Sequence, residues 1–224
     1  NNNVENIFST SVVKGSRIFI EVFEPDFVME PSRILIRKII HDYTDIMGYF
    51  PIENQERNNC NLNVACPEAD PWWNQVNSVI RMSMGGGLCS ASLINNVEQD
   101  LTPYVLTADH CISGSPGYYV FYFRYQASTC GGSSAPSSYT MNGSSLRASG
   151  DGPDFALLEL NNDVPDSFNP FFNGWNRSSS SPNDPTGIHH PGGDIKKISF
   201  TEDYVTGTYY YWEFQFDVGR IFPG

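Results

Sequence analysis

The sequence has few basic residues, and this shortage limits what the protein can bind. Its 224 residues include 13 lysines and arginines against 25 aspartates and glutamates, for a formal net charge of −12. Because binding to nucleic acid depends on clustered lysine and arginine side chains, no nucleic-acid partner is expected. The acidic surface could attract basic peptides, but solubility is the simpler interpretation of this charge.

A long apolar run is also missing. No stretch approaches the roughly 20 apolar residues that a membrane-spanning helix needs, so no membrane span is expected. The chain begins with Asn1 rather than methionine, so an upstream signal peptide could have been removed or never recorded. The 5 cysteines all fall between residues 60 and 130, and none follows. In a secreted protein, an odd number of cysteines indicates a free thiol or a missing partner.

The remaining composition favours an all-β fold. Charged residues make up 17% of the chain and aromatic residues 14%, and there are 19 glycines and 15 prolines. Such a mixture favours short strands joined by turns over long helices. The even spacing of the expected strands from residue 78 onward is typical of barrels or a sandwich. These strands are expected at residues 78–84, 89–94, 103–107, 118–125, 155–160, 197–200 and 208–216.

Residues 1–58 differ from the rest of the chain. Two apolar runs, at 17–23 and 33–40, are typical of strands, and they lie on either side of two prolines. Two strands cannot bury much apolar surface by themselves. We therefore expect residues 1–58 to be the C-terminal part of an upstream pro-region or accessory β module, and residues 59–224 to be a separate domain.

One histidine and one aspartate form the most informative pattern. His110 follows the apolar run 104–106 in the segment Thr-Ala-Asp-His-Cys, and Asp154 opens the apolar run 155–160. Either residue alone would be interpreted as structural. A general base, however, must be held with one ring nitrogen toward a hydroxyl and the other toward a carboxylate. The order of the two residues is that of a His-Asp-Ser triad, so we predict that the His110 imidazole meets a buried Asp154 carboxylate.

The same residues carry a resemblance to a known family. The segment around His110 resembles the T-A-x-H-C element of chymotrypsin-fold serine endopeptidases, and the closer likeness is to bacterial lysyl endopeptidases and secreted trypsin-like relatives. Five blocks occur in the family's order, at 60–68, 89–96, 122–130, 154–162 and 187–191. The resemblance implies two six-stranded-type antiparallel barrels, chymotrypsin-like, with the second incomplete and a small β segment before the first. Residues 59–224 would then be a trypsin-like serine peptidase domain.

The resemblance also implies roles for individual residues. His110 would be the general base and Asp154 its orienting partner. The implied disulfides are Cys66–Cys130 and Cys89–Cys111, while Cys60 would pair with a cysteine beyond Gly224. The nucleophilic serine would also follow Gly224, so the chain is expected to be truncated at its C-terminus and the fragment itself to be inactive.

These implications predict a secreted, extracellular serine endopeptidase. Its partner would be a protein or peptide substrate, with lysine at the cleaved bond as the leading expectation, and the protein is expected to be a monomer without a cofactor or metal. His189 and His190 are adjacent in an expected strand and so point to opposite faces, which argues against a shared metal ion. One alternative is a protease-like binding module that has lost its nucleophile. Another is a cell-surface β module in which the His110 and Asp154 match is accidental.

An incomplete second barrel has a further consequence. If its last strands are missing, the run 208–216 should expose an unpaired strand edge and apolar surface. Trp212 lies in this run. It is expected in the barrel core, and an approach to the substrate cleft is the alternative.

Overall fold

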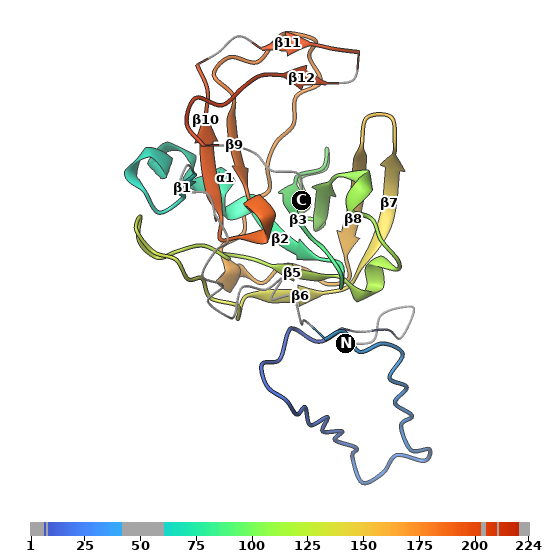
Figure 1. Ribbon diagram of the computed structural model, residues 1–224. Coiled ribbons are helices and arrows are strands. Elements are labelled where there is room, and N and C mark those ends of the chain that lie inside the picture. Colours follow the sequence, from blue (N-terminus) through green and yellow to red (C-terminus); the bar gives the residue numbers. More distant parts are fainter. Residues whose placement is uncertain (1–6, 8, 42–60, 203–204, 210, 220–224) are drawn as a thin grey trace.

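The regular structure of the described residues consists mainly of antiparallel strands, as the sequence predicts. The computed structural model describes residues 7, 9–41, 61–202, 205–209 and 211–219 (Figure 1). Within those residues there is one α-helix, α1 (Trp73–Ser78), which follows the 3₁₀ turn η1 (Pro67–Trp72). No helix in the described part of the chain is long and apolar enough to cross a membrane.

The largest element is a curled seven-stranded sheet in the order β6-β5-β2-β3-β4-β8-β7. Its two edge strands are consecutive in the chain and are separated only by Gly143. One continuous stretch therefore pairs with β5 at one edge and with β8 at the other, so the sheet closes on itself. The strands are β2 (Val79–Ser83), β3 (Leu88–Ile94), β4 (Tyr104–Thr107), β5 (Val120–Tyr122), β6 (Thr140–Asn142), β7 (Ser144–Gly150) and β8 (Phe155–Leu160).

Gly143 makes this closure possible. Its φ of 77° lies in the left-handed region, where L side chains are strained. A Cβ atom at this position would also collide with the side chain of Asn161 and lie 3.1 Å from the carbonyl oxygen of Gly117. Only glycine therefore fits the bend between β6 and β7.

The interior of the curled sheet is filled by alternate residues of its strands. In β8, for example, Ala156, Leu158 and Leu160 are buried, while the residues between them are only partly covered. This is the period of two that a half-buried strand requires. The buried core contains Ile80, Met82, Cys89, Ala91, Leu93, Val105, Cys111, Tyr119, Phe121, Phe123, Met141, Leu158 and Leu160.

The second half of the fold is smaller. A three-stranded sheet, in the order β1-β10-β9, packs on a cluster of Val64, Ala69, Val76 and Ile198. A two-stranded ribbon, β11 (Thr206–Gly207) with β12 (Trp212–Glu213), stands at the top of Figure 1. Trp212 is 41% exposed, so its expected place in the barrel core is wrong. The strands of the sheet are β1 (Leu62–Asn63), β9 (Thr186–His189) and β10 (Lys197–Phe200).

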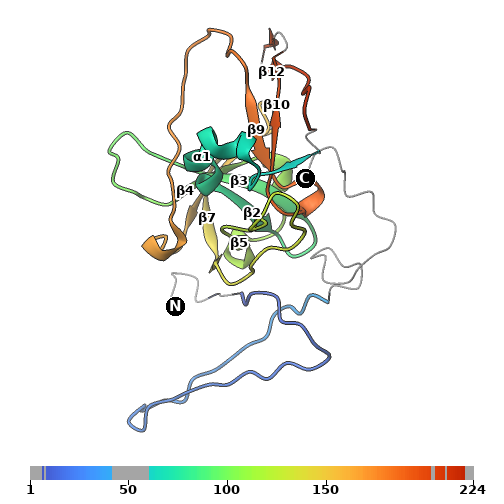
Figure 2. The same ribbon diagram turned by 90° about the vertical axis from the view of Figure 1, so that its left-hand side faces the viewer.

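Residues 9–41 form an extended arm, most of which stands away from the rest of the molecule (Figures 1 and 2). At its C-terminal end, the Ile40 side chain lies close to Gly85. The Val28 amide donates a hydrogen bond of 3.3 Å to the Pro25 carbonyl oxygen. This bond closes the turn between the two limbs of the arm, which run before and after it. Neither 17–23 nor 33–40 is a strand, so the expected small β segment is wrong for these residues. The physical reason is that the two limbs have no third strand or layer on which to bury their apolar side chains.

Candidate active site

His110 lies in a short turn that is fastened to the neighbouring strand. The turn, η2 (Asp109–Cys111), follows β4 after Ala108, and Cys111 is bonded to Cys89 of β3. On the other side of His110, the Thr107 hydroxyl donates a hydrogen bond of 2.9 Å to the Ser90 carbonyl oxygen, also in β3. A disulfide that closes a loop of this length contributes about 3 kcal/mol in the chain-entropy picture. The backbone on both sides of His110 is therefore anchored.

Asp154 reaches the same place from the adjacent strand. Strands β4 and β8 are antiparallel, with Thr107 opposite Ala156, so the end of one lies beside the start of the other. Asp154 comes one residue before β8 and has a left-handed φ of 48°. Its amide donates to the Asp151 carbonyl oxygen at 3.2 Å, which closes a tight turn. Strand register and this turn together direct the Asp154 carboxylate toward His110.

The His110 and Asp154 side chains meet through both carboxylate oxygens. The distance from His110 Nδ1 to Asp154 Oδ2 is 2.7 Å, and the His110 backbone amide donates to Asp154 Oδ1 at 3.0 Å. Both hydrogen bonds lower the pKa of Asp154, and the one from the His110 backbone amide has the larger effect. The carboxylate is therefore ionised at neutral pH, and it favours the neutral tautomer of His110 that carries its hydrogen on Nδ1.

The other ring nitrogen, Nε2, remains able to accept a proton. It makes no hydrogen bond with any residue in the part of the chain that the structure describes. The side chains of His110 and Asp154 are 51% and 37% exposed, so the expected burial of the acid is wrong. Because Asp154 sits in a turn before β8 rather than within the strand, its carboxylate lies at the rim of the sheet. The pair can thus act as a general base at an open surface.

The same corner does not offer metal ligands. Cys89, His110 and Cys111 have potential ligand atoms within 4.8 Å of one another. Both sulfur atoms, however, belong to the disulfide and are not thiolates, which are the form that binds metal. The imidazole of His110 is therefore left to proton transfer.

Sequence reasoning missed a contact from the aromatic ribbon to the Asp154 turn. The hydroxyl of Tyr211, just before β12, donates a hydrogen bond of 2.6 Å to the Gly152 carbonyl oxygen. This contact joins the second half of the fold to the turn that carries Asp154. The three consecutive tyrosines at 209–211 do not indicate which hydroxyl reaches the site, because the direction of the Tyr211 side chain depends on the ribbon.

The second predicted disulfide pair lies away from the site. Cys66 and Cys130 are bonded across a separation of 64 residues, and Asn63 Nδ2 donates to the Cys130 carbonyl oxygen at 2.5 Å. Both bridges in the structure are those that the resemblance implies. Cys60 lies outside the described residues.

A group of buried basic residues is also separate from the site. His190 is 2% exposed, and burial, with the nearby Lys196, holds its pKa well below the ordinary value. Burial lowers the pKa of Lys196 itself to about 7. Its Nζ donates to the Val76 carbonyl oxygen at 2.7 Å and to Gln126 Oε1 at 3.1 Å. His189 is also buried, which places both histidines in structural packing.

Comparison with solved structures gives a limited likeness. The crystal structure of the Rv3671c protease in its inactive form aligns with a TM-score of 0.41 and 14% sequence identity. The alignment covers 62% of this chain and 58% of that one, so this chain spans less than two thirds of the matched protein. A likeness at this level adds no weight to the assignment.

Comparison with protein families is decisive. Residues 54–218 match the family described as lysyl endopeptidase, C-terminal domain, which is well over half of the chain. The matched range contains the curled sheet, both disulfides, and the contact between His110 and Asp154. The chain therefore belongs to the lysyl endopeptidase C-terminal domain family and is related to proteases.

Proposed function

We propose that this protein is a secreted serine endopeptidase in which His110 is the general base and Asp154 orients it. The observation that carries the proposal is the 2.7 Å contact between His110 Nδ1 and Asp154 Oδ2, with Nε2 left without a partner among the described residues. An imidazole held in this way is the arrangement that activates a hydroxyl nucleophile. The two disulfides support secretion, because such bonds persist in oxidising compartments.

The proposed chemistry follows from the tautomer of His110. A serine hydroxyl on the Nε2 side would attack the scissile carbonyl while its proton passes to Nε2. The imidazolium that forms would be stabilised by the ionised Asp154 and would return the proton to the leaving amine. Water would then release the acyl group by the same route. No cofactor takes part in these steps.

Residues 1–224 do not supply that serine to His110 within the part that the structure describes. We therefore propose that this chain by itself does not hydrolyse peptide bonds, and that the nucleophile comes from a longer form of the protein. Residues 59–224 would be the peptidase domain and residues 1–58 part of a pro-region or accessory module. The substrates would be proteins or peptides, cleaved after lysine by a monomeric enzyme.

The test compares chain 1–224 with the product of the complete reading frame. We expect the complete protein to hydrolyse a lysyl ester, and we expect His110→Ala and Asp154→Asn each to lower kcat by at least about a thousandfold. Chain 1–224 should show no turnover. An arginyl ester cleaved as fast as the lysyl ester would contradict the lysine preference, and turnover that survives His110→Ala would contradict the mechanism.

A protease-like binding module is the second candidate. The absence of a hydroxyl partner for His110 Nε2 among the described residues favours it. An active-site sulfonyl fluoride separates the two, because it labels only a serine that His110 activates. Labelling of the complete protein that His110→Ala abolishes would support the enzyme, and no labelling would support the binding module.

A further inference from the structure

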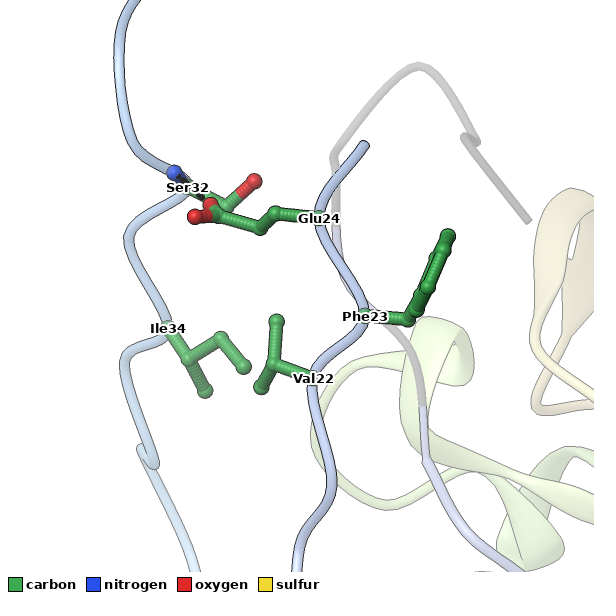
Figure 3. Close-up of a pocket in the computed structure, with 5 residues that line it drawn as sticks. All are labelled: Val22, Phe23, Glu24, Ser32 and Ile34. Atoms are coloured by element: carbon green, nitrogen blue, oxygen red, sulfur yellow. Dashed lines mark hydrogen bonds between the residues drawn. The ribbon is translucent and has the colours of Figure 1, made fainter. Parts of the chain in front are cut away.

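The groove between the two limbs of the arm brings no amine, thiol or imidazole to its surface. It is lined by Val22, Phe23, Glu24, Ser32 and Ile34 (Figure 3). Its one charged group is the Glu24 carboxylate, which accepts a hydrogen bond from the Ser32 backbone amide. A buried amine beside a side-chain amide occurs instead in the small three-stranded sheet.

Asn63 and Lys197 lie directly opposite each other in that sheet. Strands β1 and β10 are antiparallel, and Asn63 pairs with Lys197 in their register. Side chains of residues paired in this way lie side by side on one face of a sheet. Lys197 Nζ donates to Asn63 Oδ1 at 2.6 Å, across a separation of 134 residues. The amine is therefore within reach of the side-chain carbonyl group of Asn63.

The side-chain amide of Asn63 is held in one orientation. Its Nδ2 donates to the Cys130 carbonyl oxygen at 2.5 Å and to the Gly132 carbonyl oxygen at 2.8 Å. The amide cannot turn without losing both bonds, so Oδ1 stays toward Lys197. Asn63 is 6% exposed, which limits access of water. The two reacting groups are thus positioned before any bond between them forms.

Lys197 and Asp194 supply a nucleophile and a proton acceptor. The Lys197 side chain is 12% exposed, and burial lowers the pKa of its amine, an effect that the charge of Asp194 opposes. A lower pKa increases the share of neutral amine, which is the nucleophilic form. Asp194 Oδ2 lies 3.9 Å from Lys197 Nζ. A small movement of either side chain brings the carboxylate into contact with the amine.

We propose that Lys197 and Asn63 join in an isopeptide bond as a modification of the folded protein. The neutral amine Nζ attacks Asn63 Cγ, and a bond from Nζ to Cγ forms as the bond from Cγ to Nδ2 breaks. Asp194 takes one proton from Nζ and returns it to the departing Nδ2, which leaves as ammonia. The chain loses one nitrogen and three hydrogen atoms, and the step needs no co-reactant.

This bond closes a covalent ring across the domain. Asn63 precedes the closed seven-stranded sheet and Lys197 follows it, so the ring contains all of its strands. The Cys66–Cys130 bridge lies beside Asn63, whose Nδ2 bonds to the Cys130 carbonyl oxygen. An amide withstands reduction, unlike a disulfide. The ring therefore keeps β1 linked to β10 even when both disulfides are reduced.

The intact mass of chain 1–224 tests the proposal. After denaturation and reduction of the disulfides, we expect a mass about 17 Da below that of the sequence, the loss of one ammonia. Trypsin should leave the Lys197–Ile198 bond uncut and yield a branched peptide in which residues 58–81 are joined to residues 197–220. The full sequence mass, with cleavage by trypsin after Lys197, would overturn the proposal.

A succinimide is a second source of the same mass loss. Asn142 and Asn173 each precede a glycine, and an Asn-Gly pair can lose ammonia by closing such a ring. A succinimide hydrolyses in mild base, whereas an isopeptide bond survives. The mass loss should therefore persist after incubation in mild base, and its disappearance would count against the bond between Lys197 and Asn63.

Three substitutions assign the bond to this pair. Lys197→Arg keeps the positive charge but removes the nucleophilic amine, so the full mass should return. Lys38→Arg, in the exposed arm, is the matched control and should keep the loss. Asp194→Asn should leave most of the protein at the full mass, because the amine loses its proton acceptor.

The variants also show what would contradict the assignment. A mass loss that survives Lys197→Arg would overturn the role of this lysine, and complete linkage in Asp194→Asn would overturn the proton transfer. The test measures mass and not peptide hydrolysis, so its result is independent of the proposed endopeptidase activity.

Discussion

The hydroxyl of Tyr211 bonds to the carbonyl oxygen of Gly152, two residues before Asp154. The turn between them is also closed by the bond from the Asp154 amide to the Asp151 carbonyl oxygen. Tyr211 therefore holds the outer side of the turn that presents the carboxylate to His110. We assign it a positioning role.

Tyr211→Phe tests this role. Removal of the hydrogen bond should lower the free energy of unfolding by about 1 kcal/mol. It should also speed hydrogen exchange at the Asp154 amide, because the turn opens more often once its outer contact is gone. Amides of β2 in the same sample serve as the control and should exchange as before. An unchanged rate at Asp154 would show that the turn holds itself.

The pH dependence of stability should report the bonds to Asp154. Because the His110 backbone amide and imidazole lower the pKa of Asp154 in the folded state, the unfolded chain binds the proton first as the pH falls. The stabilisation is therefore complete above the unfolded pKa, near 3.9, and is lost as the pH falls through the folded pKa. Urea unfolding between about pH 2 and 6 should show a steeper acid loss for the native chain than for Asp154→Asn. Parallel curves for the two proteins would contradict the contribution of this carboxylate.

Lys196 should produce a second rise in stability with pH, in the alkaline range. Burial lowers its pKa from 10.5 to about 7, so between these values the unfolded chain binds a proton that the folded chain has released. Stability should therefore rise as the pH increases from about 7 to about 10.5, by on the order of 4 kcal/mol. Lys196→Met should remove most of this rise in chemical unfolding curves, whereas Lys38→Met, in the exposed arm, should keep it. Lys197, whose pKa is also lowered by burial, adds a part of the rise that should remain wherever its amine is not bonded to Asn63. An undiminished rise in Lys196→Met would contradict the contribution of Lys196.

Gly143 should be the least replaceable glycine of the curled sheet. Gly143→Ala places a methyl group against Asn161 and Gly117 at a left-handed φ, and we expect a loss of about 2 kcal/mol or more in the free energy of unfolding. The matched control is Gly86→Ala, where no atom lies within 4 Å of the added carbon. That change should stay within about 0.5 kcal/mol. Equal losses for the two variants would show that the bend tolerates a side chain.

Strands with alternating burial could be predicted from the sequence. The predicted strands 155–160 and 197–200 coincide with β8 and β10, because their apolar residues face a packed interior. The run from Ser144 to Gly150 was missed. It is a strand of seven residues whose side chains after Ser144 are mostly exposed, and its place in the sheet comes from pairing with β8. Because β7 is held by its pairing with β8 and not by burial of one face, its sequence lacks the alternation of apolar and polar residues that would identify a strand.

Strands were also predicted where the structure has none, in the arm, and where it has only a short one, β12 of the ribbon. Apolar residues at 17–23 and 33–40 have the composition of strands but no sheet to join, and Phe19 and Phe23 are 90% and 88% exposed. Composition describes what a segment can bury, whereas burial needs a partner that lies elsewhere in the chain. The meeting of His110 with Asp154 was predictable because residue order and a family motif both pointed to it. The exposure of Asp154 was not, because it depends on which elements cover the rim.

Every strand of the closed sheet lies between Val79 and Leu160, and so do His110, Asp154 and the Cys89–Cys111 bridge. The strand pairing that brings the imidazole to the carboxylate therefore needs no residue after Leu160. A folded base can thus exist before a hydroxyl is in place, and the order in which the two halves fold then sets when His110 has a group to deprotonate.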